Sequence, residues 1–252
     1  MVMNAKPYLR EVSLKRDKIS NYERYPFNLP VVRSLKRLRF HPDVTFIIGE
    51  NGSGKSTLLE AIAAAWGFNP EGGTINFRFS TRSSHSDLYD YLRLVRSTRR
   101  PKDGFFLRAE SFFNLATNIE HMDAEPSFAP PIIDSYGRRS LHEQSHGESF
   151  LALLLNRFGG NGIYILDEPE AALSPTRQLA VLGRIHQLVL RESQFIIATH
   201  SPILMAYPRA KIVLLEENGF AEVRYEETEH YAVTKEFMSD PERMLHAVLV
   251  RD

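Results

Sequence analysis

The stretch Gly49-Glu50-Asn51-Gly52-Ser53-Gly54-Lys55-Ser56-Thr57 directly follows the strand-like run Val44-Thr45-Phe46-Ile47-Ile48. It matches in full the pattern G-x-x-x-x-G-K-[ST] of a loop that binds phosphate groups. Glycines let successive backbone N–H groups turn inward around phosphate oxygens, and the helix expected at 55–66 directs its positive end at the same anion. In such a loop the lysine reaches the terminal phosphates and the serine ligates Mg²⁺. The stretch therefore predicts a nucleoside triphosphate site, contacted by Asn51, Gly52, Ser53, Gly54, Lys55, Ser56 and Thr57.

A second motif lies where another apolar run ends in two acids. Ile163-Tyr164-Ile165-Leu166 is followed by Asp167, Glu168 and Pro169. A buried central strand of this kind delivers Asp167 to the carboxyl edge of a sheet, where it holds Mg²⁺ directly or through water. Glu168, the next residue, is placed to orient and deprotonate an attacking water. Downstream of a phosphate loop, this acidic pair predicts hydrolysis of the bound nucleotide.

Strand and helix signals alternate along the chain, which favours an α/β fold with a mainly parallel central sheet. Strands are expected at 8–14, 44–48, 75–79, 105–107, 163–166, 195–198, 211–216 and 220–225. The last two flank a Glu-Asn-Gly turn and predict an antiparallel edge. Helices are expected at 55–66, 87–96, 110–119, 147–157, from 174 onwards and in the C-terminal tail. We expect one domain over 1–252, with a small helical arm at about 80–145 inserted between the two motifs.

Composition excludes several classes of site. The 252 residues contain no cysteine, which excludes disulfides, thiol catalysis and Cys-ligated zinc. The first residues lack the apolar core of a signal peptide, and no run approaches the roughly 18 apolar residues of a membrane span. These features predict a cytoplasmic protein. The net charge is zero, but residues 1–110 carry 19 Lys+Arg against 11 Asp+Glu. This asymmetry marks a basic face unless the two halves mix on one surface.

Five short sequence motifs occur in the order that is typical of the ABC-type ATPase superfamily, and the chain therefore resembles that superfamily. In it, the P-loop NTPase fold binds and hydrolyses ATP with Mg²⁺. Beyond the two motifs above, Ser145-His146-Gly147-Glu148 stands at a helix start, where the family has its LSGGQ-like signature. Ala172-Leu173-Ser174-Pro175 stands where the family has its D-loop, and His200 follows a strand as the family's switch histidine does. The resemblance covers about residues 43–202.

The resemblance also implies roles for these residues. Lys55 and His200 contact the γ-phosphate, Glu168 is the catalytic base, and Ser56 and Asp167 hold the metal. Ser145 and the Gly147 amide cap the γ-phosphate of ATP on a second copy, so that a homodimer encloses two nucleotides. Taken alone, Ser145 is also an ordinary helix N-cap and His200 a histidine packed at a strand end.

Some positions depart from the family's pattern. His146 replaces the first glycine of the signature, and Glu148 stands at its last position, as in the SMC and DNA-repair branches. The family's sensor glutamine is missing, and Arg108-Ala109-Glu110 occupies its place. Glu110 either contacts a metal-bound water or starts a helix. The adenine-stacking aromatic has three candidates, Tyr22, Tyr25 and Phe27.

These features predict an ATP-dependent dimerisation switch that resembles the small stand-alone ATPases of the SMC and repair branch and acts with a nucleic-acid or protein partner. Only 87 residues separate Thr57 from Ser145, and no heptad pattern predicts a coiled coil there. The alternatives are the energising subunit of an ABC transporter, with a membrane partner, and a scaffold that binds ATP without hydrolysing it. A basic cluster either contacts the phosphates of a nucleic acid or is solvated charge on a helix surface; its members are Arg93, Arg96, Arg99, Arg100 and Lys102.

Overall fold

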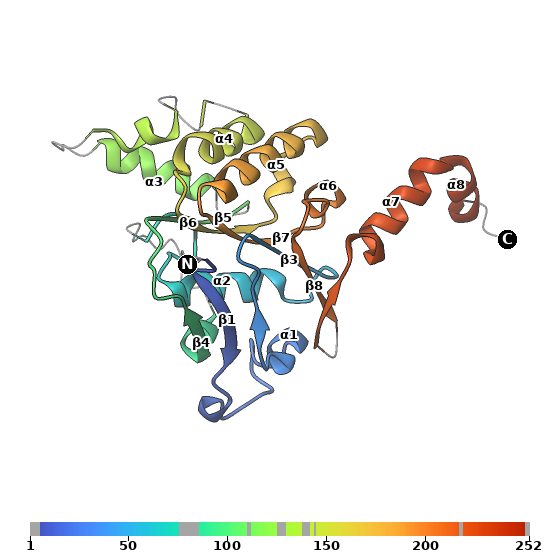
Figure 1. The fold of residues 1–252 in the computed structure, drawn as a ribbon, viewed down its shortest axis with the longest axis horizontal. Coiled ribbons are helices and arrows are strands. Elements are labelled where there is room, and N and C mark those ends of the chain that lie inside the picture. Colours follow the sequence, from blue (N-terminus) through green and yellow to red (C-terminus); the bar gives the residue numbers. More distant parts are fainter. Residues whose placement is uncertain are drawn as a thin grey trace, which may run out of the picture.

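The computed structural model in Figure 1 describes residues 6–75, 86–109, 112–124, 130–137, 142–143, 145–216 and 219–249. Within these ranges the chain forms two sheets. The larger has the order β5-β6-β7-β3-β8-β9 and is parallel except for β9. Its strands are β3 (Val44–Ile48), β5 (Asp103–Arg108), β6 (Gly162–Asp167), β7 (Gln194–Ala198), β8 (Lys211–Glu216) and β9 (Gly219–Val223). The smaller antiparallel sheet has the order β2-β1-β4, with β1 (Leu9–Leu14), β2 (Leu38–Arg39) and β4 (Leu92–Arg96). The predicted α/β fold is confirmed.

Helices cover both faces of the larger sheet (Figure 1). One face carries α3 (Phe112–Ala124), α4 (His146–Ala152) with a π-helical continuation (Leu153–Arg157), and α5 (Pro175–Leu190). The other face carries α2 (Lys55–Trp66), α1 (Pro30–Ser34) and the smaller sheet. After β7 comes the short α6 (Pro202–Met205), and after β9 come α7 (Glu229–Ser239) and α8 (Pro241–Leu249), which extend away from the sheets. Single 3₁₀ turns lie at Arg16–Lys18, Asp87–Tyr91, Ile132–Tyr136, Pro169–Ala172 and Tyr225–Glu227.

The central strands are buried on both faces, and their side chains alternate between two cores. In β3, Val44, Phe46 and Ile48 belong to the core under α5, whereas Ile47 belongs to the core around α2. A parallel sheet covered on both sides requires apolar residues at successive positions. This explains why the strands that lead into the two nucleotide motifs are apolar at nearly every position, with the buried Thr45 as the exception in β3.

The helix predicted at 87–96 is wrong. This segment forms a 3₁₀ turn and then β4, which pairs with β1 from Leu14↔Leu92 to Leu9↔Arg96. Leu92 is buried while Arg93 is exposed, as the two-residue period of a strand requires. The range 80–145 therefore contributes β4 and β5 to the two sheets, and its described helical elements are α3 and the 3₁₀ turns Asp87–Tyr91 and Ile132–Tyr136. The strand predicted at 75–79 lies, beyond residue 75, outside the described residues.

Candidate nucleotide site

The phosphate loop connects β3 to α2 and depends on glycine at two left-handed positions. Gly52 has φ of 80° and Gly54 has φ of 93°, a region that costs an L-residue about 1–2 kcal/mol. A Cβ on Gly54 would also lie 2.6 Å from Val31 Cγ1, because α1 packs directly against the loop. Any side chain at Gly54 would therefore displace both the loop backbone and α1.

Lys55 is folded back over this loop. Its side chain is almost fully buried, and its Nζ donates to the carbonyl oxygens of Gly49 and Glu50, both at 2.9 Å. Burial lowers the pKa of Lys55, while the carboxylates of Glu168 and Asp167 act in the opposite direction. The ammonium group is thus held at the loop by neutral oxygens, which phosphate oxygens can replace with a gain in charge attraction.

Ser56 and Asp167 come together from α2 and the end of β6. The Ser56 hydroxyl donates to Asp167 Oδ1 at 3.1 Å, and Asp167 is buried. Among the described residues there is no group of three or more His, Cys, Asp and Glu side chains that could hold a metal. Mg²⁺ at a phosphate loop needs no such group, since it takes oxygen ligands from one hydroxyl, one carboxylate, water and the nucleotide. The two residues therefore fit the predicted ion.

Arg108 stands where the sensor glutamine was expected. It ends β5 in register with Asp167, and its Nε lies 3.6 Å from Asp167 Oδ2. Its Nη1 donates to Glu60 Oε2 of α2 at 2.7 Å. A permanent positive charge thus borders the candidate metal ligand. Glu110, the other residue considered for this place, lies outside the described residues.

Glu168 and His200 face one another across the ends of β6 and β7. Glu168 has left-handed backbone (φ 50°, ψ 53°), and its N–H donates to Ala198 O at 3.0 Å. Its Oε1 lies 3.7 Å from His200 Nε2, and its carboxylate is 42% exposed. A carboxylate that is accessible to water and lies beside the phosphate loop can accept a proton there.

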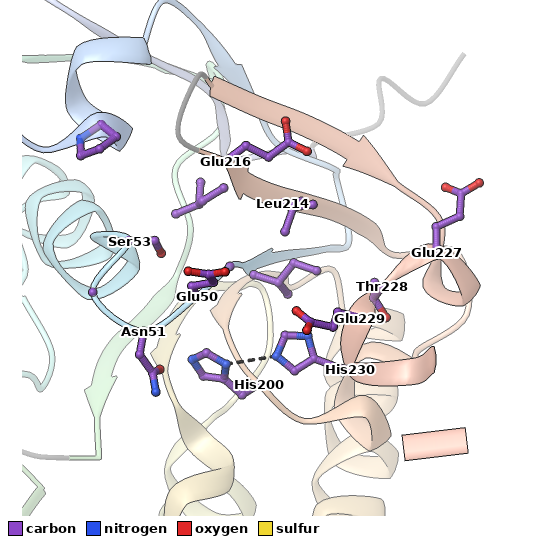
Figure 2. Close-up of a pocket in the computed structure, with 15 residues that line it drawn as sticks. Glu50, Asn51, Ser53, His200, Leu214, Glu216, Glu227, Thr228, Glu229 and His230 are labelled. Atoms are coloured by element: carbon purple, nitrogen blue, oxygen red, sulfur yellow. Dashed lines mark hydrogen bonds between the residues drawn. The ribbon is translucent and has the colours of Figure 1, made fainter. Parts of the chain in front are cut away.

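His200 is held from two sides. Its backbone N–H donates to Oε1 of the half-buried Glu170, and its ring Nδ1 lies 3.1 Å from Nε2 of His230 on α7 (Figure 2). Burial lowers the pKa of both histidine rings, with Lys55 acting in the same direction. His230 was not predicted as a site residue, since it stands in a polar helical tail, 30 residues after His200, with no local pattern that marks it.

Two pockets flank the phosphate loop. The larger has a volume of about 710 Å³ and lies between the loop, His200, the end of β8 and the start of α7 (Figure 2). The smaller, about 280 Å³, is lined by Tyr25, Leu29, Asn51, Gly52, Glu168 and residues 54–57. Of the three aromatic candidates, Tyr25 alone lines this pocket and is 57% exposed. Phe27 is buried against the Tyr91 ring, and Tyr22 packs against the core around α2.

The signature residues stand at the start of α4. Ser145 is the N-cap, and its N–H donates to Glu148 Oε2 at 3.1 Å. A Cβ on Gly147 would lie 2.4 Å from Ala172 O and 2.6 Å from Arg177 Nη1, so the helix start approaches the D-loop segment closely. In the described part of the chain, neither Ser145 nor Gly147 lines a pocket at the phosphate loop. The side chain of His146 is outside the described residues.

Part of the basic cluster has a structural role. The Arg96 guanidinium lies 4.4 Å from the centre of the Trp66 ring and donates to Ala65 O and Trp66 O at the end of α2. Arg99 Nη2 donates to Asn161 Oδ1 at 3.0 Å. The other three members, Arg93, Arg100 and Lys102, are exposed on β4 and the turn that follows it.

Two family models match consecutive parts of the chain. One, described as "AAA domain", matches residues 18–120 and contains the phosphate loop. The other, described as "AAA domain, putative AbiEii toxin, Type IV TA system", matches residues 132–206 and contains the signature, the acidic pair and His200. The chain belongs to the AAA/ABC-type P-loop ATPases. The predicted superfamily and the predicted enzyme class, ATP hydrolysis, are thereby confirmed.

Two relatives of this ATPase are named as ABC transporter ATP-binding proteins. It is 27% identical over 187 residues to an uncharacterized ABC transporter ATP-binding protein of Haemophilus influenzae, covering 69% of this chain and 70% of that one. It is 25% identical over 217 residues to a putative ABC transporter ATP-binding protein of Caldanaerobacter subterraneus, covering 81% and 86%. The SMC head domain from Thermotoga maritima matches with 15% identity and a TM-score of 0.46, covering 86% of this chain and 99% of that one. None of the helices in the described ranges has the length and apolarity to cross a bilayer.

Proposed function

We propose that this ATPase is an ATP-dependent dimerisation switch, in which the whole chain acts as one ATPase domain and two copies enclose two nucleotides. One observation carries the proposal. Hydrolytic side chains gather at the phosphate loop, where Ser56 contacts Asp167 and Glu168 faces His200. The signature residues Ser145 and Gly147 lie at the start of another helix and line neither pocket of their own loop. A second copy would supply them.

Each residue has a definite task in this proposal. Lys55 exchanges its two carbonyl acceptors for phosphate oxygens of ATP. Ser56 and Asp167 hold Mg²⁺, which when bound neutralises charge on the β- and γ-phosphates. Glu168 takes the proton from the water that attacks the γ-phosphorus, and the products are ADP and phosphate. His200 contacts the γ-phosphate through Nε2.

The adenine ring is assigned to the smaller pocket. Tyr25 is exposed there beside the residues that begin α2, so its ring is free to stack on a base. An offset stack of two aromatic systems adds about 1 kcal/mol to the area that it buries.

The glutamine variant Glu168→Gln tests the dimer. It removes the proton acceptor and keeps the size of the side chain, so ATP should stay bound and the protein should sediment as a dimer with ATP and Mg²⁺. A second variant, Glu168→Gln with Ser145→Arg, places a bulky cation where the partner's γ-phosphate is capped and should sediment as a monomer. If Glu168→Gln binds ATP and remains monomeric at saturating nucleotide, the proposed enclosure of two nucleotides is wrong.

We further propose that the switch acts with a nucleic-acid or protein partner. In support, Arg93, Arg100 and Lys102 are exposed around the edge strand β4, and Glu148 is of the SMC and repair type. The second candidate is the energising subunit of a transporter, which the names of the curated relatives favour.

Steady-state ATP hydrolysis with and without double-stranded DNA, at low and moderate salt, tests the nucleic-acid partner, with Glu168→Gln as the blank. Stimulation that weakens with salt and is lost in Arg93→Glu/Arg100→Glu supports a DNA partner, since phosphate contacts depend on counterion release. Hydrolysis that is indifferent to DNA rejects that partner and favours the protein or membrane partner.

A further inference from the structure

The ring of His200 makes its one described hydrogen bond to another histidine. His200 Nδ1 and His230 Nε2 are 3.1 Å apart, and the two ring centres are 5.3 Å apart (Figure 2). The contact joins the loop after β7, which carries His200, to the first turn of α7, a helix outside the residues that the family models match. Both rings border the larger pocket at the phosphate loop.

The first turn of α7 is fixed in place by its N-cap. The buried Thr228 hydroxyl accepts from the N–H of Tyr231 at 3.3 Å and donates to Tyr225 O at 2.8 Å. His230 lies inside this capped turn, and its ring is therefore presented to His200 by a defined backbone. The rest of α7 and all of α8 contain no buried residue, so the histidine contact lies where the helix pair joins the protein.

The surrounding charges select which nitrogen carries each proton. Two neutral imidazoles can share the bond in either direction, because each has one donor and one acceptor nitrogen. His200 Nε2 lies 3.7 Å from the Glu168 carboxylate. If His200 donated from Nδ1, the lone pair on its Nε2 would face that negative oxygen. If His230 donates, His200 presents Nε2–H to the carboxylate, which is the favourable arrangement.

We propose that His230 is a positioning residue that donates to His200 Nδ1 and so holds the switch histidine as the Nε2–H tautomer, ready to donate to the γ-phosphate. This inference rests on the proposed role of His200. It gives α7 a direct connection to hydrolysis, because displacing the first turn of this helix releases the ring and tautomer of His200. The other groups around the pair are Lys55 and Glu168 beside His200, the Glu170 carboxylate on its backbone, and Glu229 beside His230.

Nitrogen NMR of the full chain labelled with ¹⁵N-histidine tests the tautomer directly. The signals of His200 are identified by their loss in His200→Gln. We expect the Nε2–H tautomer in the unaltered protein and a mixture of both tautomers in His230→Ala. A His200 ring that is protonated on Nδ1, or one whose signals do not change in His230→Ala, would overturn the proposal.

Kinetics separate positioning from mere structural support. His230→Ala should lower kcat about tenfold, the effect of losing one hydrogen bond to a reacting group, and leave the Kd for ATP within about twofold. His230→Gln retains an N–H donor at the same reach and should recover kcat to within about threefold. The matched control is His186→Ala, since His186 on α5 has a comparable Nδ1 contact, 3.1 Å from the Tyr207 hydroxyl, at another place. It should leave kcat unchanged.

The variant His200→Ala distinguishes failure of this inference from failure of the proposed function. If His200→Ala abolishes hydrolysis and His230→Ala does not reduce it, His230 has no positioning role. If His200→Ala retains full activity while the NMR tautomer is as expected, the contact is real and the proposed role of His200 in hydrolysis is wrong.

Discussion

Replacing Arg108 by glutamine should lower the concentration of Mg²⁺ that the ATPase needs. The guanidinium lies 3.6 Å from the carboxylate that is assigned to the metal, and it pairs with Glu60 on its other side. In the nucleotide-free protein it therefore offsets the negative charge that would attract the ion. Arg108→Gln removes this competing charge, leaves Glu60 as a further negative group, and introduces the glutamine that the resemblance to ABC-type ATPases led us to expect at this place.

The size of the effect follows from the distance. Two unit charges 3.6 Å apart interact by about 1 kcal/mol in water and about 5 kcal/mol at an effective dielectric constant near 20. The Arg108 side chain is 16% exposed and that of Asp167 is 7% exposed, so the true value lies between these limits. Even the lower limit corresponds to roughly a fivefold change in affinity for the ion, and 1.4 kcal/mol corresponds to a factor of about ten.

The assay is ATP hydrolysis as a function of free Mg²⁺ at saturating ATP. Arg108→Gln should reach half-maximal rate at a concentration at least about fivefold lower than the unaltered protein. The control for net charge is Lys211→Gln, which removes a cation paired with Glu222 at 3.1 Å on the β8–β9 hairpin and should leave the Mg²⁺ requirement unchanged. A requirement that is unchanged or higher in a folded Arg108→Gln protein would refute the competition between Arg108 and the ion.

Three further predictions concern packing, base recognition and pH. Gly147→Ala should lower the free energy of unfolding by about 1–3 kcal/mol, because the new Cβ would lie 2.4 Å from the carbonyl oxygen of Ala172. Calorimetry measures this change. An unchanged unfolding midpoint would show that the start of α4 can move aside. Tyr25→Ala should raise the Kd for ATP about fivefold and Tyr25→Phe should not, as measured by nucleotide titration, and equal values for both would place the base elsewhere. Burial lowers the pKa of His41, His200 and His230 below the ordinary value of 6.5, so the folded state favours the neutral rings. Their contribution to stability is full above about pH 6.5 and is lost as the pH falls through the lowered values, so thermal unfolding should shift to lower temperature between about pH 7 and about pH 5. A midpoint that rises over this range would contradict that sign.

The parallel sheet and the strand ends were predictable because their signals are local. An apolar run that stops at a glycine or an acid marks a buried strand and its carboxyl edge, and this holds for β3 and β6; β7 is also an apolar run, but it is followed by Thr199 and His200. The structure accordingly brings Ser56 to Asp167 and Glu168 to His200, as their positions after these strands suggested.

The remaining features depend on partners that are distant in sequence. The segment 87–96 has enough apolar and charged residues for a helix, but β1 needs a neighbour, and pairing between Leu14 and Leu92 decides its structure. The roles proposed for Arg108 and His230 depend on their contacts with Asp167 and His200. No spacing in the sequence predicts these contacts. Likewise, only the folded structure distinguishes Tyr25 from Phe27 as a candidate for stacking on the base, because the Tyr25 ring is exposed and the Phe27 ring is buried.

The strand order also determines when this protein can fold during its synthesis. β3 lies between β7 and β8, and its first residue, Val44, is paired with Phe195, 151 positions later in the chain. At translation rates of about 5–20 residues per second, the strand that carries the phosphate loop waits roughly 8–30 s for its neighbours to be made. All five residues of β3 are buried in the finished protein, so during that interval their apolar side chains are exposed or are covered by a chaperone. Nascent chains arrested before β7 should therefore aggregate or remain chaperone-bound, and the phosphate loop is among the first functional segments to be made and among the last to be completed.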